Sequence, residues 1–173
     1  MKLISSIGGG LAGACALTLL HEIIKRLDSE APRMDLMGMQ AVKKGIKKAD
    51  QPIPDDKHLY QIAMVGDIIS NTIYYSLGVA GKRKYIWPKG ALAGAAAGLG
   101  AIFLPKSLGL NPAYSSRTLK TKAFTTGLYL IGGLVASAVA KKLENDNRKK
   151  RLGPMKRPFD LISYNRDSFL RKV

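Results

Sequence analysis

The sequence predicts an all-α integral membrane protein, a bundle of about four helices with one amphipathic helix at the membrane interface. The first observation is that apolar and basic residues are segregated into blocks, although the mean hydropathy of the 173 residues is near zero. The second is that four apolar segments approach or exceed the roughly 20 residues that a membrane-spanning helix needs. The third is that three of these segments lack the polar face, of period 3.6, that helices on a soluble core show.

The predicted membrane domain covers residues 1–140, and its four spans are residues 3–24, 59–81, 85–105 and 123–140. The first span starts like a signal peptide but continues to Lys25, with its small residues in the middle, which favours an uncleaved anchor over a cleaved signal. The second span is unusually polar. The third begins with Tyr85 and Trp87 beside a basic cluster, a composition typical of the membrane interface.

Residues 34–49 are predicted to form the interfacial helix. Its two faces differ, because Met39, Val42, Ile46 and Ala49 fall opposite an arc of four lysines. That arc, a candidate site for anionic lipid headgroups, consists of Lys43, Lys44, Lys47 and Lys48. The alternative is an amphipathic helix packed on the protein itself.

Residues 141–173 form a basic tail with 11 Lys and Arg against 4 acidic residues. We expect Gly153 and Pro154 to end the last helix and residues 159–170 to form a short docked element. The net charge of +16 suggests a polyanionic partner, either nucleic acid or an anionic membrane. The tail lacks the aromatic platforms of a nucleic-acid module, so we expect membrane lipids and no specific nucleic acid.

The positive-inside rule does not separate two topologies. Four spans place 16 basic residues on the side of the termini against 12 on the other side. Three spans, with the glycine-rich third segment re-entrant or buried, place 19 against 9. We favour four spans because residues 90–104 have no polar side chains with which to line a re-entrant cavity.

Small residues recur every four positions in three spans, in the manner of a glycine zipper. The glycines concerned are Gly9, Gly13, Gly90, Gly94, Gly98 and Gly133. In lipid, helices associate through such close backbone approaches. We therefore predict tight crossings, with the third span against the first, and self-association or contact with other membrane subunits.

Asp67, near the middle of the second span, is the sharpest candidate for a functional residue. A charge at that depth is costly and marks a functional site by default. Gln61, Asp67 and Asn71 are predicted to project to roughly one side, toward the bundle interior, a pore or a proton path. The alternative is that Asp67 is structural and hydrogen-bonds Ser, Thr or Tyr on a neighbouring helix.

No motif predicts catalysis, a cofactor or a metal site. Cys15 is the sole cysteine, so no intrachain disulfide can form, and there are two histidines. His21 and Glu22 resemble half of a metalloenzyme motif, but no second histidine follows, and Glu22 is expected to pair with Lys25 or Arg26. P-loop, dinucleotide and nucleophile-elbow patterns are missing from the sequence.

Two blocks resemble YagU-type bacterial inner-membrane proteins. They are "GLAGACALTLLHEIIKRLDSEAPRMD" and "IWPKGALAGAAAGLGAIFLPKSLGLNPA", about half of the chain, and their motifs are loose and hydrophobic. The first block ends with Arg33 and Asp35, which are expected to bind headgroups or to pair with residues inside the protein. The resemblance implies a multi-pass protein of the bacterial cytoplasmic membrane associated with acid tolerance. That family's histidines in later helices have no counterparts here.

These observations favour a non-enzymatic accessory or scaffold protein that works through helix packing and anionic lipid. The alternative is a protein that handles protons or a solute, related to acid stress and centred on Asp67. A membrane enzyme using His21 and Glu22 is a distant third.

Overall fold

The computed structural model describes residues 3–152, which form six α-helices and one 3₁₀ helix and contain no strand. In chain order the elements are α1 (Leu3–Leu27), α2 (Met34–Lys48), α3 (Asp56–Val79), η1 (Arg83–Tyr85), α4 (Ile86–Ser107), α5 (Ala113–Ser116) and α6 (Leu119–Leu152). The all-helical prediction is thereby confirmed for these residues. The predicted helix end at Gly153 and the predicted element at residues 159–170 lie outside the described residues.

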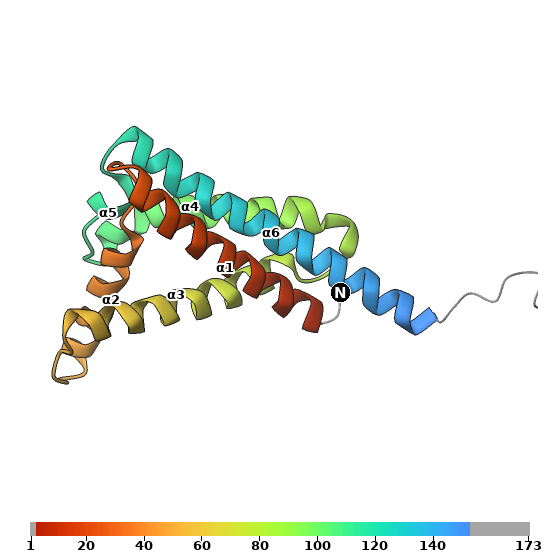
Figure 1. Ribbon diagram of the computed structural model, residues 1–173, viewed down its shortest axis with the longest axis horizontal. Helices are drawn as coiled ribbons and strands as arrows, with labels where there is room; N and C mark the ends of the chain where they lie inside the picture. Colours follow the sequence, from red (N-terminus) through yellow and green to blue (C-terminus); the bar gives the residue numbers. More distant parts are fainter. Residues whose placement is uncertain (1–2, 153–173) are drawn as a thin grey trace, which may run out of the picture.

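Four long helices, α1, α3, α4 and α6, run along the long axis of the molecule (Figure 1). Helices α1 and α4 both pack extensively on α6, and α3 packs on α1. The chain reverses direction between successive long helices, so that both α1 and α4 are antiparallel to α6. The short helices α2 and α5 lie together at the end where α1 terminates and α6 begins (Figure 1).

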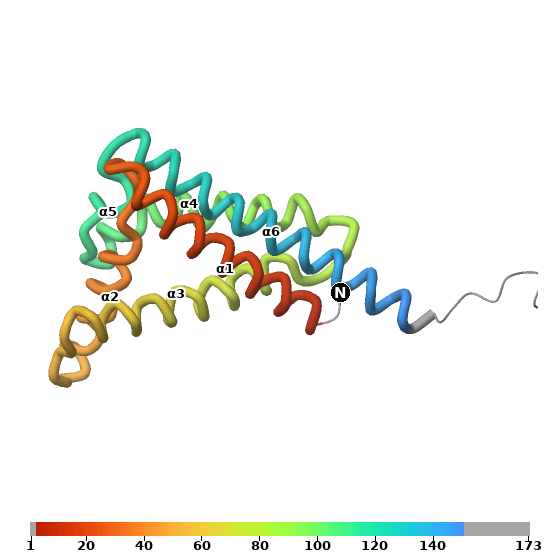
Figure 2. The backbone as a smooth tube through the Cα atoms, in the orientation of Figure 1, coloured from red at the N-terminus to blue at the C-terminus, as the bar shows by residue number. Residues whose placement is uncertain are grey.

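The long helices do not form a uniform bundle. The backbone trace shows α3 close to α1 near the N-terminus of α1 and diverging from it toward the other end (Figure 2). At the close end, Gly10 lies against Thr72 and Ser76 of α3. At the open end α2 packs on α3 and crosses between the two helices. The bundle is therefore a wedge whose wide end is closed by α2.

The spaced glycines lie where α6 approaches its neighbours most closely. A Cβ atom at Gly9 or Gly13 would collide with α6 around Ala136, and one at Gly94 would lie 2.6 Å from the carbonyl oxygen of Tyr129. Gly90 and Gly133 face each other, and Gly98 lies against Thr126. The expected crossing of the third span with the first is therefore wrong, because both glycine stripes contact α6 from different sides.

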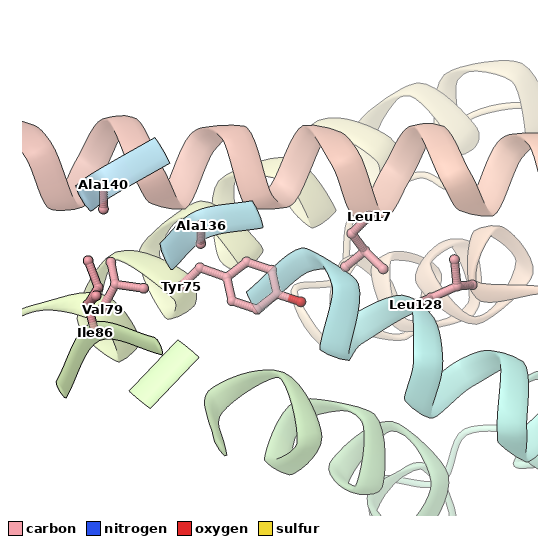
Figure 3. Packing of buried hydrophobic residues seen from close by; sticks show 7 residues of the cluster. All are labelled: Leu17, Tyr75, Val79, Ile86, Leu128, Ala136 and Ala140. Carbon is pink, nitrogen blue, oxygen red and sulfur yellow. The ribbon is translucent and has the colours of Figure 1, made fainter. Parts of the chain in front are cut away.

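Side chains from all four long helices form the hydrophobic core (Figure 3). Its buried members are Leu17, Tyr75, Val79, Ile86, Leu128, Ala136 and Ala140. Tyr75 is fully buried, and its hydroxyl donates a hydrogen bond of 2.8 Å to the carbonyl oxygen of Tyr129. A Cβ atom at Gly132 of α6 would lie 2.6 Å from the Tyr75 hydroxyl oxygen, so this glycine leaves room for the ring, and Tyr75 links α3 to α6.

Within residues 3–152, three helices are long and apolar enough to cross a membrane: Leu3–Leu27, Arg83–Ser107 and Leu119–Lys150. They correspond to the first, third and fourth predicted spans and indicate a membrane protein. The glycine-rich segment, for which a re-entrant course was the alternative, is one continuous helix. The remaining long helix, α3, corresponds to the unusually polar second predicted span and is not among these three.

Helix α2 occupies the range predicted for the interfacial helix. Met37, in its first half, is buried, and the helix contacts α3 and α5. Its second half carries Lys43, Lys47 and Lys48 as exposed side chains. The alternative of a helix packed on the protein itself therefore describes the first half of α2.

Candidate functional site: a chamber around Asp67

A chamber opens in the wide end of the wedge, between α1, α2, α3 and α6. It contains about 540 Å³ of space not filled by protein, part of it open to the outside. Most of its wall is apolar. The lining residues are Leu17, Thr18, His21, Pro32, Met34, Asp35, Gly38, Tyr60, Ala63, Met64, Asp67, Thr125, Leu128 and Tyr129.

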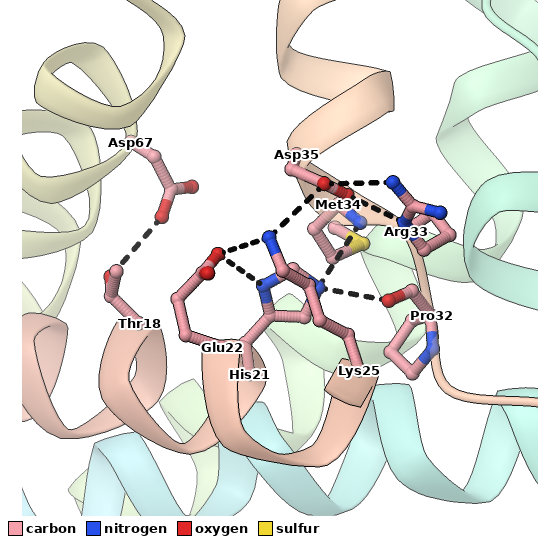
Figure 4. A network of polar contacts seen from close by, with 9 residues as sticks. All are labelled: Thr18, His21, Glu22, Lys25, Pro32, Arg33, Met34, Asp35 and Asp67. Atoms are coloured by element: carbon pink, nitrogen blue, oxygen red, sulfur yellow. Dashed lines mark hydrogen bonds and ion pairs between the residues drawn. The ribbon is translucent and has the colours of Figure 1, made fainter. Parts of the chain in front are cut away.

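Asp67 contributes a carboxylate to the α3 wall of the chamber. Its Oδ1 accepts a hydrogen bond of 2.9 Å from Asn71 Nδ2, one helical turn further along α3. Its Oδ2 lies 3.5 Å from the hydroxyl of Thr18 on α1, a long contact (Figure 4). The structure thus brings together two of the three predicted polar residues and adds Thr18, which the sequence did not single out.

Gln61, the third predicted member of the polar site, is exposed and does not line the chamber. Six residues separate it from Asp67, which corresponds to about 240° around an α-helix at 3.6 residues per turn. The prediction that Gln61 faces the same side as Asp67 is therefore wrong. Asn71 is four residues from Asp67 and does share its face.

Asp67 differs from the other chamber carboxylate in its charge environment. Asp35 Oδ2 forms ion pairs with Lys25 Nζ at 3.2 Å and with Arg33 at 3.1 Å. Among the ion pairs that the described residues form, none includes Asp67. Hydrogen bonds to an amide and a hydroxyl solvate a carboxylate but do not neutralise it. Asp67 is thus the chamber carboxylate without a cationic partner in this part of the chain.

Asp35 and its partners form a closed ionic network at the wide end (Figure 4). Lys25 Nζ also contacts Glu22 Oε1 at 2.5 Å, which confirms the expected pairing of Glu22 with Lys25. Burial opposes ionisation of Asp35, but hydrogen bonds from Arg33 and Lys25 outweigh it and lower the pKa of Asp35 to about 2. Of the two roles left open for Arg33 and Asp35, the structure shows internal pairing.

His21 fastens the link between α1 and α2. Its Nε2 lies 2.8 Å from the carbonyl oxygen of Pro32 and 3.3 Å from the backbone nitrogen of Met34. One ring nitrogen cannot donate to the first and accept from the second at once. The shorter contact fits Nε2–H donating to Pro32, which leaves Nδ1 facing Glu22 Oε1 at 3.8 Å. In this arrangement His21 orders the Pro-Arg segment at the chamber wall.

The predicted lipid-headgroup lysines all lie on exposed positions of α2. Lys44 differs from the others because its Nζ donates a hydrogen bond of 2.6 Å to the carbonyl oxygen of Leu108, after α4.

Within residues 3–152, no cluster of three His, Cys, Asp or Glu side chains is arranged to hold a metal ion. The side chains that line the chamber supply carboxylates, hydroxyls, an imidazole, aromatic rings and apolar surface.

No family model, curated protein sequence or solved structure matches the chain. The functional argument therefore rests on the geometry of this molecule. The residues that the sequence did not reveal, Thr18, Tyr60 and Tyr129, come from three helices and lie far apart in the chain. Only the divergence of α3 from α1 brings them to one chamber, and no local pattern encodes that divergence.

Proposed function

We propose that the protein is a multi-pass membrane protein with four spans, α1, α3, α4 and α6, that takes up a proton or a small solute at Asp67. The proposal is non-enzymatic. The observation that carries it is the Asp67 carboxylate, which faces a chamber from the middle of α3 and lacks a cationic partner among the described ion pairs. Placement in a bacterial cytoplasmic membrane follows from the resemblance to YagU-type proteins alone.

The direction of the helices supports a membrane-crossing α3. Gly9 and Gly13 meet α6 in antiparallel order, and so do Gly90 and Gly98, so α1 and α4 run parallel to each other. If both cross the membrane, the chain must return across it between them. The long helix that makes this return is α3, whose 24 residues span about 36 Å at 1.5 Å per residue.

The outer surface of α3 supports the same placement. An apolar stripe runs along it at helical spacing, with side chains between 46% and 72% exposed: Ile62, Val65, Ile69, Ile73 and Leu77. Asp67 lies on another face, against α1. Asp67 and Asn71 therefore lower the mean hydropathy of α3 without facing lipid, which is the arrangement expected for intramembrane polar residues.

The flanking aromatic residues mark the membrane surface in this proposal. Tyr85 and Trp87 are 46% and 42% exposed at the start of the η1–α4 segment. Lys84 lies 4.6 Å from the Tyr85 ring centre, and Lys141 lies 5.6 Å from that of Trp87. Amphipathic rings beside lysines are typical of the headgroup region. The narrow end of the wedge then faces one aqueous compartment, and α2 faces the other.

The experiment that tests this function uses the full chain reconstituted in liposomes with a trapped pH indicator. We expect an imposed membrane potential to drive proton entry that Asp67→Asn abolishes. The matched control is Asp56→Asn, which removes the same charge from an exposed position at the start of the same helix. Equal proton entry by the wild type and Asp67→Asn, or equal entry by empty liposomes, would overturn proton handling at Asp67.

The accessory or scaffold function remains a second proposal. The exposed lysines of α2 favour contact with anionic headgroups, because each surface cation contributes about 1 kcal/mol near an anionic membrane. The glycine stripes give this proposal less support than the sequence indicated, because contacts with α6 within the same chain already occupy them.

A further inference from the structure

We propose that the chamber binds an amphipathic organic cation, an alkylammonium group with an attached apolar body, with the ammonium at Asp67. This inference rests on the proposed function and specifies its ligand class. The cation replaces the proton on Asp67, so a bound cation and a bound proton exclude each other. The protonated carboxyl releases its proton to water as the ammonium takes its place.

Charge complementarity is the first argument. A carboxylate within a largely apolar chamber is stable only when it is protonated or paired with a cation. Lys25 and Arg33 are held by Asp35, and Lys25 also by Glu22, so these cations are engaged in the ionic network. Asp67 therefore either holds a proton or takes its counter-cation from outside this ionic network.

The wall of the chamber gives the second argument. Leu17, Met64 and Leu128 provide apolar contact surface, which a hydrated metal ion or a bare ammonium ion would not use. Tyr60 and Tyr129 add aromatic rings, and aromatic faces attract alkylammonium groups. Lys25 Nζ lies 5.4 Å from the Tyr60 ring centre, so Tyr60 already has a cationic partner and Tyr129 is the chamber ring without one among the described cation–π contacts.

The groups facing the chamber determine how its binding depends on pH. Other titratable and charged side chains also line the chamber or pair at its rim. They come from α1, α2, α3 and α6 and from the link between α1 and α2: His21, Glu22, Lys25, Arg33, Asp35, Tyr60 and Tyr129. Asp35 stays ionised because its pKa is about 2.

The test measures binding of benzyltrimethylammonium to the full chain in detergent by equilibrium dialysis. This quaternary cation carries no titratable proton, so any pH dependence comes from the protein. Its neutral analogue neopentylbenzene has the same shape without the charge. We expect the cation to bind, with affinity falling by up to about ten-fold per pH unit when Asp67 is protonated, and the neutral analogue to bind more weakly.

Four variants complete the test. Asp67→Asn should weaken cation binding by about ten-fold or more, whereas Asp56→Asn should leave it unchanged. Met64→Trp, which fills the chamber without changing charge, should weaken binding of both probes. Folding of each variant is checked by its circular dichroism melting curve, and Asp67→Glu, which keeps the charge, should retain binding if Asp67→Asn does not fold.

Three outcomes overturn the inference: equal binding of the charged and neutral probes, undiminished cation binding by Asp67→Asn, or no binding by the wild type. The liposome experiment separates these failures from failure of the proposed function. Asp67-dependent proton entry without cation binding removes the inferred ligand class and leaves proton handling intact. Absence of both effects removes both.

Discussion

Gly94→Ala tests the close contact between α4 and α6. The new Cβ atom would lie 2.6 Å from the Tyr129 carbonyl oxygen and 2.7 Å from the Cα atom of Leu130. Both neighbours are backbone atoms, so no side-chain rotation relieves the collision and the helices must separate. Overpacking of this kind costs about 1–3 kcal/mol. Alanine regains about 0.5–1 kcal/mol over glycine through its higher helix propensity.

The matched control is Gly100→Ala on the same helix. Its Cβ atom would meet the Leu104 Cδ1 atom at 3.5 Å, an ordinary van der Waals contact. Both variants gain the same helix propensity, so their difference in unfolding free energy isolates the overpacking, about 1–3 kcal/mol. The assay is unfolding of the purified chain in mixed micelles, followed by far-UV circular dichroism as the denaturing detergent fraction rises. Equal stability of the two variants would refute the proposed packing of α4 on α6.

Three further predictions concern other contacts. Tyr75→Phe removes one buried hydrogen bond and should lower the unfolding free energy by about 1 kcal/mol in the same mixed-micelle assay, with no change contradicting the α3–α6 tie. Asp35 has a lower pKa in the folded than in the unfolded chain, so its stabilisation is complete above about pH 4 and lost as pH falls toward 2, a contribution of about 2 kcal/mol. Asp35→Asn should therefore be less stable at pH 7 and lose this acid dependence, and a wild-type melting temperature that is flat from pH 5 to pH 2 would count against the network. Reversing three charges, as K43E/K47E/K48E, should reduce the phosphatidylglycerol that co-purifies with the protein by native mass spectrometry, and an unchanged lipid content would oppose headgroup binding by α2.

The helices themselves were predictable from the sequence because apolar periodicity and length are local properties. All four long helices and α2 appear within a few residues of their predicted ranges at most boundaries. Helix α6 continues past the predicted span, which ends at residue 140, to Leu152, in agreement with the expectation that the last helix runs on toward Gly153. The basic residues after Ala140 continue the helix because lysine, arginine and glutamate are good helix formers, and charge alone does not end a helix.

The partners of the helices could not be predicted in the same way. Spacing identified the glycines of α1 and α4 as contact residues, but any helix with small residues can face such a stripe. The choice of α6 depends on the complementary small residues of α6, such as Gly132 and Ala136, and on the chain reversals between the helices. Sequence spacing alone does not distinguish among the possible pairs.

The candidate site was predictable at one residue. Asp67 stood out because a carboxylate is costly in an apolar helix. Its chamber depends on α2 separating α3 from α1 at one end, and that separation depends on His21 and Asp35 fixing the link between α1 and α2. These contacts are a hydrogen bond and an ion pair between the end of α1 and the start of α2. Residues able to form such contacts across a turn are too common in sequences to indicate a chamber.

Cysteine accessibility at two neighbouring positions of α3 tests most directly whether Asp67 faces a water-accessible chamber inside a membrane. In a Cys15→Ala background, Asp67→Cys and Ile69→Cys are treated in sealed membranes with a small, impermeant, cationic thiol reagent. Asp67 lines the chamber, whereas Ile69 is 55% exposed on the outer stripe and would face lipid. We predict labelling at position 67 and none at position 69. Labelling at both positions would place α3 outside the membrane, and labelling at neither would contradict an accessible chamber.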